Sequence, residues 1–231
     1  EKILFSNDAF GQHLATSERF DDEYSLDIIM EEARKYYANI VLPYSQQVQK
    51  ALSDVSGLKI ETIATSHGVI WRKNIDKIIE AYKQWSSNEV KKKALIVYDT
   101  MWHSTEKMAD TIASAFSEKG YQYKILSLQQ NHISDIMTEI LEAEYICVGS
   151  PTLNNNMLPT VSAFLTYMKG LAPKGRKGFA FGSFGWGGQS VKQVHEILES
   201  CGYEMLEPAG IKFRPDDEAL NTIKENLVKA I

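Results

Sequence analysis

Short apolar runs alternate with amphipathic stretches from residue 93 to residue 231. The apolar runs are Ala94–Tyr98, Tyr123–Leu128, Tyr145–Gly149 and Gly178–Gly182, with two shorter ones around Met205–Leu206 and Ile211–Phe213. Helical periodicity fills residues 104–119, 133–142, 159–169, 188–200 and 216–230, most clearly where Met108, Ile112 and Phe116 share one face. Continuous apolar strands separated by amphipathic helices predict an α/β fold with a doubly wound, five-stranded parallel sheet.

The first 85 residues follow a different pattern. Helical stretches run over Ser25–Leu42, Tyr44–Val55 and 74–85, Pro43 breaks the first two apart, and strand candidates lie at Lys2–Phe5 and Lys59–Thr65. Three helices and about two strands cannot easily close a sheet and core of their own. Because Glu1 is not a methionine either, we expect residues 1–88 to be the end of a domain that starts upstream. The polar stretch 86–93 reads as a linker to a second domain, 89–231.

Composition excludes several classes of function. The chain is 44% hydrophobic and carries a net charge of −5, which provides no basic field for nucleic acid or an anionic membrane. There is no signal-peptide pattern and no apolar run as long as a membrane span. The two cysteines, Cys147 in an apolar run and Cys201 after a helical pattern, form no disulfide framework. This usage is typical of a reducing compartment, so we expect a cytoplasmic protein.

Three polar or glycine-rich loops follow predicted strands, where open parallel sheets bind their ligands. The first loop contains Thr100, Met101, Trp102, His103, Ser104 and Thr105; the second contains Ser150, Pro151, Thr152, Leu153, Asn154 and Asn155; the third contains Ser183, Phe184, Gly185, Trp186, Gly187 and Gly188. We predict that these residues bind a cofactor, and we predict no catalytic residue of the acid–base or nucleophile type.

The first loop suits a phosphate group. It leads into the clearest helix, whose free N–H groups and dipole favour an anion, and its hydroxyls add donors. Neither GxxxxGK[ST] nor GxGxxG occurs in the sequence. A monophosphate held without lysine or arginine fits FMN better than ATP or NAD. The alternative for this loop alone is simple helix capping by Ser104.

The third loop and the first each carry a tryptophan. Trp102 and Trp186 could stack on a flat conjugated ring from two sides of a groove. Gly185, Gly187 and Gly188 would let backbone N–H groups approach the ring, and the second loop would supply neutral polar groups to its edge. Taken singly, each tryptophan could equally be a half-buried surface anchor.

Together the segments 100–106, 150–155 and 183–188 resemble the flavodoxin-like domain of flavodiiron proteins, the A-type flavoproteins that reduce dioxygen to water or nitric oxide to nitrous oxide. The resemblance covers residues 93–231 and implies a flavodoxin-like fold with bound FMN. Upstream, residues 5–13 and 65–68 resemble the end of the family's metallo-β-lactamase-like domain. By this correspondence Asp8 would bridge two irons and His67 would bind one of them, roles that suit a carboxylate and an imidazole.

Without the family, Asp8 reads as a turn residue and His67 as a loop histidine, while His13 reads as a surface histidine more than as a neighbour of the metal. The family's remaining ligands come from an H-x-E-x-D motif and another histidine, and that motif is missing from the sequence. Two candidate ligands are too few for a di-iron centre. Proteolysis or a shortened chain, a separate polypeptide that supplies the front half, or its true loss would each explain the difference, and we favour the first two.

The leading hypothesis is therefore FMN-dependent electron transfer within a flavodiiron-type oxidoreductase, with the di-iron centre complete only if the upstream half is supplied. The resemblance implies a rubredoxin-like protein or an NAD(P)H-dependent reductase as electron donor, dioxygen or nitric oxide as substrate, and a head-to-tail homodimer. The alternative is an FMN electron-transfer module with no working metal site. A metallo-hydrolase fares badly, because it lacks the same ligands and leaves the flavin loops unexplained.

Overall fold

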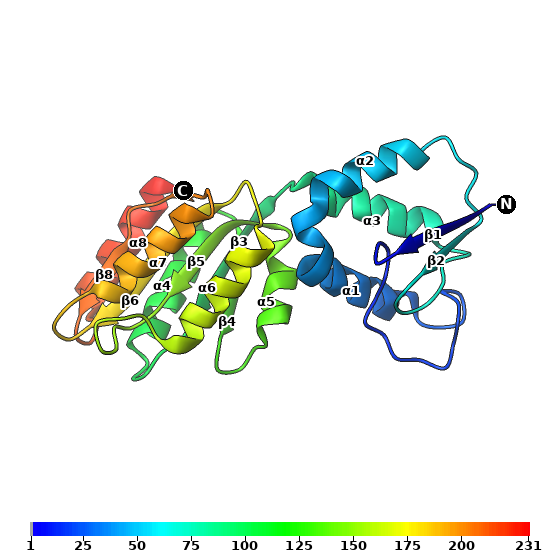
Figure 1. Ribbon diagram of the computed structural model, residues 1–231. Coiled ribbons are helices and arrows are strands. Elements are labelled where there is room, and N and C mark those ends of the chain that lie inside the picture. The colour runs from blue at the N-terminus through cyan, green and yellow to red at the C-terminus, as the bar shows by residue number, and fades with distance from the viewer. Residues whose placement is uncertain (1) are drawn as a thin grey trace. The chain divides into compact units, whose positions relative to one another are not determined.

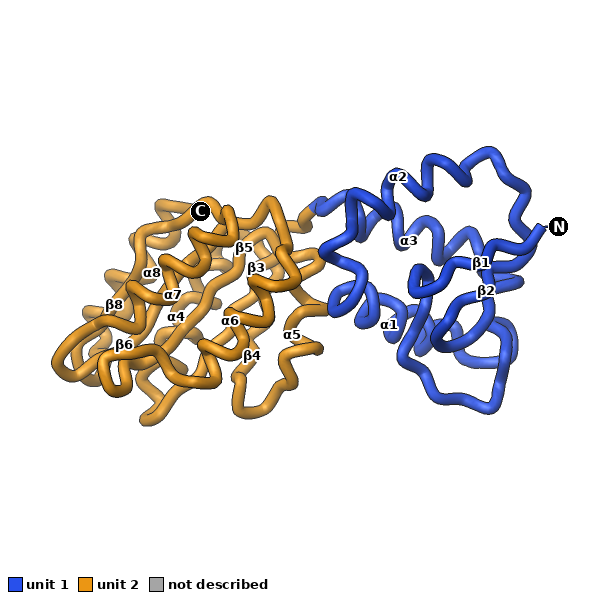
Figure 2. The backbone as a smooth tube through the Cα atoms, viewed as in Figure 1, with its two compact units in different colours: residues 1–89 blue, residues 90–231 orange. Residues whose placement is uncertain are grey.

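The computed structural model describes residues 2–231 and divides into two compact units. Unit 1 comprises residues 1–89 and unit 2 comprises residues 90–231 (Figure 2). Within residues 2–231, no helix combines the length and the apolar character that a bilayer crossing requires.

Unit 2 is built on one parallel sheet (Figure 1). Its strands are β3 (Lys91–Tyr98), β4 (Gln122–Ser127), β5 (Ala143–Gly149), β6 (Lys177–Phe184), β7 (Glu204–Met205) and β8 (Ala209–Lys212). The order is β4-β3-β5-β6-β7, and β8 pairs with β6 further along the same edge. The last position of the predicted five-stranded sheet is thus shared by two short strands, and the predicted doubly wound parallel fold is confirmed.

Helices cover both faces of this sheet (Figure 1). They are α4 (Ser104–Glu118), α5 (Ile133–Ile140), α6 (Pro159–Leu171), α7 (Gln189–Ser200) and α8 (Asp217–Ala230). The predicted apolar face of α4, Met108, Ile112 and Phe116, is fully buried. It packs with α8 against β3, β5 and β6 in one core cluster. Burying the three side chains contributes about 1.5–3 kcal/mol each, which holds the start of α4 firmly at the end of β3.

Unit 1 has two parallel strands, β1 (Ile3–Asn7) and β2 (Thr62–Thr65), with three helices. The helices are α1 (Leu26–Tyr36), α2 (Ser45–Val55) and α3 (Ile75–Ser87). Between α1 and α2 the chain stays coiled through a π-helical turn, η1 (Tyr37–Val41), and a 3-10 turn, η2 (Leu42–Tyr44), which contains Pro43. Proline lacks the N–H that a continuous helix needs, so the predicted break occurs here as a change of helix type.

The core of unit 1 is aromatic. Tyr37, Trp71 and Tyr82 are fully buried. The rings of Tyr37 and Tyr82 meet edge to face with 5.0 Å between centroids, and the indole N–H of Trp71 donates to the carbonyl of Phe10 at 2.8 Å. This packing fixes the turn that follows β1.

The junction between the two units falls inside the polar stretch 86–93, between Glu89 and Val90, although most of this stretch belongs to a helix or a strand. Helix α3 runs on to Ser87, with Ser86 buried, and ends at Asn88 in the left-handed conformation. Strand β3 then begins at Lys91, whose ammonium pairs with Glu142 at 2.6 Å. The run of lysines is the exposed start of a strand whose later residues are buried, so its polar composition was misleading.

Asp21 gives unit 1 a pH-sensitive hydrogen-bond centre. Its carboxylate is 1% exposed and accepts the backbone N–H groups of Arg72, Lys73 and Asn74, at 2.7, 3.2 and 2.7 Å, just before α3. Burial alone would raise the pKa of Asp21, but these hydrogen bonds and that of the Asn74 amide outweigh it and lower the pKa.

A lowered folded-state pKa means that the stabilisation is complete above the unfolded pKa of about 3.9 and is lost as the pH falls through the folded value. We expect Asp21→Asn to lower the free energy of unfolding of unit 1 at pH 7 by about 2 kcal/mol and to flatten its dependence on pH below about 4. Urea denaturation across this pH range measures both. The control is Asp22→Asn, an exposed partner of Arg72, whose cost should stay below about 1 kcal/mol. Equal effects of the two variants would contradict the assignment.

Candidate functional site

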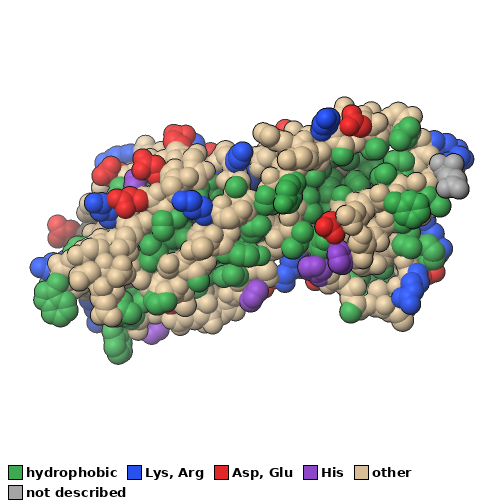
Figure 3. Space-filling view, viewed as in Figure 1, with side chains coloured by type: hydrophobic (Ala, Val, Ile, Leu, Met, Phe, Trp, Pro, Cys, Tyr) green, Lys and Arg blue, Asp and Glu red, His purple; other side chains and the backbone are tan. Residues whose placement is uncertain are grey.

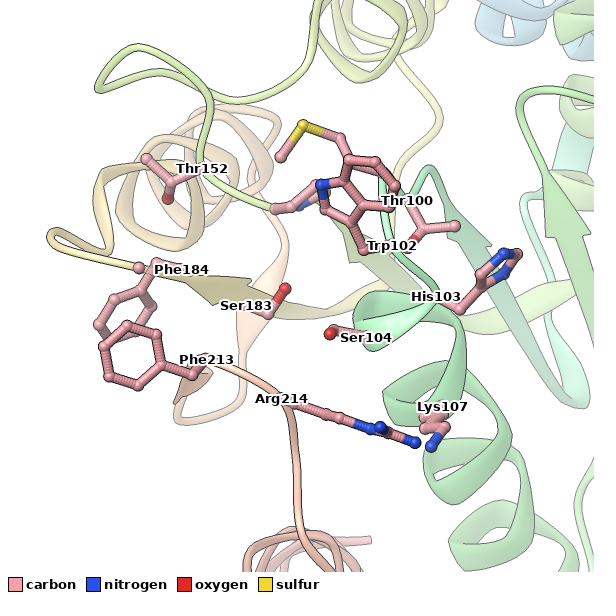
Figure 4. Close-up of a pocket in the computed structure, with 13 residues that line it drawn as sticks. Thr100, Trp102, His103, Ser104, Lys107, Thr152, Ser183, Phe184, Phe213 and Arg214 are labelled. Atoms are coloured by element: carbon pink, nitrogen blue, oxygen red, sulfur yellow. The ribbon is translucent and has the colours of Figure 1, made fainter.

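A groove of about 540 Å³ opens beyond the carboxyl ends of β3, β5, β6 and β8 (Figure 4). This is a normal size for a small-molecule site. It is lined by Thr100, Met101, Trp102, His103, Ser104, Lys107, Pro151, Thr152, Ser183, Phe184, Gly185, Phe213 and Arg214. All three predicted loops contribute to it, so the structure brings Ser104 and Gly185 to one groove.

The first loop is shaped for the start of α4. Asp99, at the end of β3, is 4% exposed; its carboxylate accepts the N–H of Thr100 and the amide of Gln129, both at 2.6 Å, and the hydroxyl of Thr160. His103 then takes a left-handed conformation, with φ of 61°, directly before the helix. The predicted capping by Ser104 does not occur: the cap position is His103, and it makes no side-chain capping bond within the described chain.

Two hydroxyls of this loop are buried without partners. Among residues 2–231, neither Thr100 Oγ1 nor Thr105 Oγ1 has a hydrogen-bond partner, and Thr105 is fully buried. A buried hydroxyl without a partner costs about 1–3 kcal/mol. Together with the uncapped first turn of α4, these hydroxyls form a set of donors that fits an anionic group such as a phosphate.

The second loop divides between groove and scaffold. Pro151 and Thr152 line the groove, whereas Ser150 is fully buried and its Oγ accepts the N–H of Leu158 at 2.9 Å. Asn154 and Asn155 both have positive φ, 50° and 62°, and form the tight turn closed by two backbone bonds between Leu153 and Asn156. Leu153, Asn154 and Asn155 therefore lie outside the lining.

The third loop contributes Ser183, Phe184 and Gly185 to the lining, while Trp186, Gly187 and Gly188 lie outside it. The two tryptophans differ. Trp102 lines the groove and is 85% exposed; Trp186 is 99% exposed and is not among the lining residues. The stacking of both indoles on one flavin ring therefore stays a prediction, with Trp102 in the groove lining and Trp186 outside it.

A fourth loop, after β8, completes the groove and was missed. Phe213, with φ of 64°, donates its N–H to the carbonyl of Phe184 at 2.7 Å, and Figure 4 shows the two phenyl rings side by side at one end of the groove. Arg214 follows it, and Lys107 joins from α4. Ligands bind at the carboxyl ends of parallel strands, and β8 is one of them. This rule could have identified Phe213 and Arg214, which directly follow β8, as site residues.

Glu106, in the first turn of α4, is not among the residues that line the groove. Glu106 on α4 binds the imidazole of His103 at 2.6 Å and accepts the hydroxyl of Tyr98 at 3.1 Å. The hydrogen bond with His103 lowers the pKa of Glu106, and that with Tyr98 adds to the effect. Burial of Tyr98, and to a smaller degree its hydrogen bond with the Glu106 carboxylate, raises the pKa of Tyr98 to about 12.

Comparison with known proteins agrees with this geometry. The family model of flavodoxin matches residues 96–225, more than half of the chain. The chain belongs to the flavodoxin family. Within a flavodoxin domain the orphaned hydroxyls, the helix start and the aromatic walls support FMN as the cofactor.

The similarity to flavodiiron proteins extends beyond the flavodoxin domain. The chain is 45% identical to the nitric oxide reductase of Moorella thermoacetica, covering 97% of this chain and 57% of the relative. It matches the structure of rubredoxin oxygen:oxidoreductase from Desulfovibrio gigas with a TM-score of 0.95 and 40% identity, over 100% of this chain and 59% of that one. The flavodiiron protein of Giardia intestinalis gives 0.93 and 35%, over 99% and 57%. These findings confirm the resemblance, and the chain spans less than three fifths of each relative's length.

Ahead of the flavodoxin domain, unit 1 brings the two predicted metal-binding residues together. His67 Nε2 lies 3.4 Å from Asp8 Oδ1, and both side chains are about half exposed. His13, predicted to be a plain surface histidine, has its ring 5.9 Å from that of His67 and 4.6 Å from that of Tyr36. Figure 3 shows histidine and acidic side chains next to each other on this surface of unit 1.

Asp8 also contacts the phenol of Tyr36. Burial first, and then the charge and hydrogen bond of Asp8, raise the pKa of Tyr36 to about 12. Among residues 2–231 no group of three or more His, Cys, Asp or Glu side chains is arranged to hold a metal ion. Asp8 and His67 therefore fit a metal only as part of a larger ligand set.

Proposed function

We propose that this chain carries the FMN-dependent electron-transfer step of a flavodiiron-type oxidoreductase that reduces dioxygen to water or nitric oxide to nitrous oxide. The observation that carries the proposal is the groove at the carboxyl ends of β3, β5, β6 and β8, with the orphaned hydroxyl of Thr100 in its lining and that of Thr105 buried in the first turn of α4. The names of the relatives, a nitric oxide reductase and a rubredoxin oxygen:oxidoreductase, support the same reaction class.

The loops would divide the cofactor between them. Thr100, Ser104 and Thr105, with the first N–H groups of α4, would bind the phosphate. Trp102 would cover one face of the isoalloxazine, and Thr152, Ser183 and Gly185 would bind its polar edge. The other predicted cofactor-binding residues would shape the rim of the groove and support it. They are Met101, His103, Ser150, Pro151, Leu153, Asn154, Asn155, Phe184, Trp186, Gly187 and Gly188.

When bound, FMN would supply redox chemistry, taking electrons from a donor and passing them to an acceptor. The chain's own part is to hold the ring with neutral groups and aromatic surfaces. A rubredoxin-like protein or an NAD(P)H-dependent reductase would be the donor. The exposed side chains of Trp102 and Phe213, which both line the groove, support a docking role for its rim, because exposed apolar patches mark interaction sites.

Residues 1–88 would be the end of a metallo-β-lactamase-like domain. Asp8 would bridge two irons and His67 would bind one, with the other ligands supplied by further polypeptide, either in a longer chain or in a separate one. An apolar groove of about 460 Å³ beside β1, lined by Phe5, Ile40 and Tyr44 among others, supports this proposal. The assembly would be a head-to-tail homodimer, and its location would be the cytoplasm.

The second candidate is an FMN electron-transfer module without metal chemistry. It is favoured by the presence of only two of the ligands among residues 2–231. Iron analysis separates the two candidates: about two irons per chain in the assembly that contains this chain, with consumption of dioxygen or nitric oxide, supports the reductase. Absence of iron with intact flavin supports the module.

Titration with FMN tests both candidates at once. We expect one FMN per chain and strong quenching of flavin fluorescence, because the ring would lie against Trp102. Trp102→Ala should weaken the quenching, whereas Trp85→Phe, a change inside unit 1 where Trp85 is 7% exposed, should leave it unchanged. A protein that binds no FMN after reconstitution would refute the proposal.

A further inference from the structure

Two cations converge on one side of the cofactor groove. Lys107 comes from the second turn of α4 and Arg214 from the segment between β8 and α8, and both line the groove. Figure 4 shows the Arg214 side chain extending across towards the ammonium of Lys107, below Ser104. Segments more than 100 residues apart thus place two positive groups at the same place.

Lys107 and Arg214 form no ion pair with any residue in the described range 2–231. The acidic side chains near them in the sequence are bound to other groups or have a raised pKa. Glu106 is held by His103 and Tyr98, and Asp216 accepts the N–H of Ala219 at the start of α8.

Asp110, one turn beyond Lys107, forms no ion pair in the same range; its pKa is raised by burial and by the charge of Glu106. Two like charges brought together without a counter-ion repel each other, so this arrangement favours an anion between them.

The chemistry of the neighbouring groups identifies the anion. Thr100, which lines the groove, and Thr105 have buried hydroxyls without partners, and α4 begins at Ser104 without a side-chain cap among the described residues. Hydroxyls, helix N–H groups and two cations together match the needs of a phosphate dianion, which has three acceptor oxygens and a charge near −2. A carboxylate would use fewer of these donors.

We propose that Lys107 and Arg214 bind and neutralise the phosphate of FMN, so that this chain reads the charged tail of the flavin and discriminates against riboflavin. The inference rests on the proposed function. It departs from the sequence-based expectation, in which hydroxyls and amides hold the phosphate without lysine or arginine. An Arg–phosphate contact can use two parallel N–H bonds, whereas lysine acts as a point charge.

The test compares FMN and riboflavin in five proteins: the unaltered chain, Lys107→Gln, Arg214→Gln, Arg214→Lys and the control Lys212→Gln. Lys212 is exposed on β8 next to Phe213 and lies outside the groove lining. Its substitution by glutamine therefore removes one positive charge near the groove without changing the lining. We expect each of the first two substitutions to weaken FMN binding about tenfold and to leave riboflavin binding unchanged. Lys212→Gln should alter neither affinity appreciably, and Arg214→Lys should restore part of the loss.

A second measurement uses the unaltered protein. Its affinity for FMN, but not for riboflavin, should fall as ionic strength rises, because salt screens exposed charges. Three results would overturn the inference and leave the proposed function intact. They are an equal loss of affinity for both flavins, no loss of FMN affinity in Lys107→Gln or in Arg214→Gln, and a salt dependence that riboflavin shares. Failure of the unaltered protein to bind FMN would overturn the proposed function itself.

Discussion

Replacing Gly182 with alanine is expected to lower the free energy of unfolding of unit 2 by about 3 kcal/mol. Gly182 lies near the end of β6, where a Cβ atom would overlap the backbone oxygen of Ser150 and press on Val191. That oxygen cannot move freely, because it accepts the hydroxyl of Ser190 at 2.9 Å. The second and third loops would have to separate, so FMN binding should weaken as well.

The matched control is Gly170→Ala. Gly170 lies in the last turns of α6, and nothing stands within 4 Å of its would-be Cβ. Alanine is the better helix former, so this change should stabilise unit 2 by about 0.5–1 kcal/mol. Urea denaturation followed by circular dichroism measures both variants, with the two units treated as separate transitions. Similar stability of the two variants would show that the strands are not packed as closely as described.

Thr105→Val is expected to improve the ligand-free protein and impair the holoprotein. The hydroxyl of Thr105 is buried and has no partner within residues 2–231, so an isosteric methyl should raise stability by up to about 1 kcal/mol. The same change removes a donor to the charged phosphate, so we expect FMN binding to weaken about 10- to 100-fold. Opposite signs distinguish a ligand-binding residue from a structural one.

Thr111→Val is the control for this pair of measurements. Thr111 lies on the same helix, and its hydroxyl donates to the carbonyl of Lys107 at 3.0 Å. Substitution there should leave FMN affinity unchanged. Isothermal titration and thermal unfolding without flavin give the two quantities. If Thr105→Val destabilises the free protein and spares FMN binding, the hydroxyl has a structural role and the assignment is wrong.

The sequence predicted the sheet well because strands that are buried on both faces consist of continuous apolar residues. Residues 94–98 and 145–149 are continuous apolar runs, and both are interior strands of unit 2. Helix α4 showed its buried face by spacing alone. The polar stretch 86–93 contains the junction of the two units but gave no sign of the strand that begins at Lys91, because composition records solvent exposure and not backbone conformation.

The sequence predicted those parts of the candidate site that lie in loops directly after strands. It missed the residues that only tertiary packing brings to the groove. Nothing local marks Arg214 as a neighbour of Lys107, since their proximity depends on α8 packing beside α4. The predicted role of Trp186 requires a side chain turned toward the groove, a property that the sequence does not encode locally; in the structure the indole is almost fully exposed and is not among the lining residues. Ser150 stays a predicted cofactor-binding residue, but no pattern in the sequence indicated that its side chain is fully buried and that its hydroxyl oxygen accepts the N–H of Leu158.

The four tryptophans fall into two pairs of opposite environment. Trp71 and Trp85 are 0% and 7% exposed in unit 1, and Trp102 and Trp186 are 85% and 99% exposed in unit 2. One pair emits from an apolar surrounding and the other from water. The protein therefore carries two optical reporters of different colour, one sensitive to the melting of unit 1 and the other to what occupies the groove of unit 2.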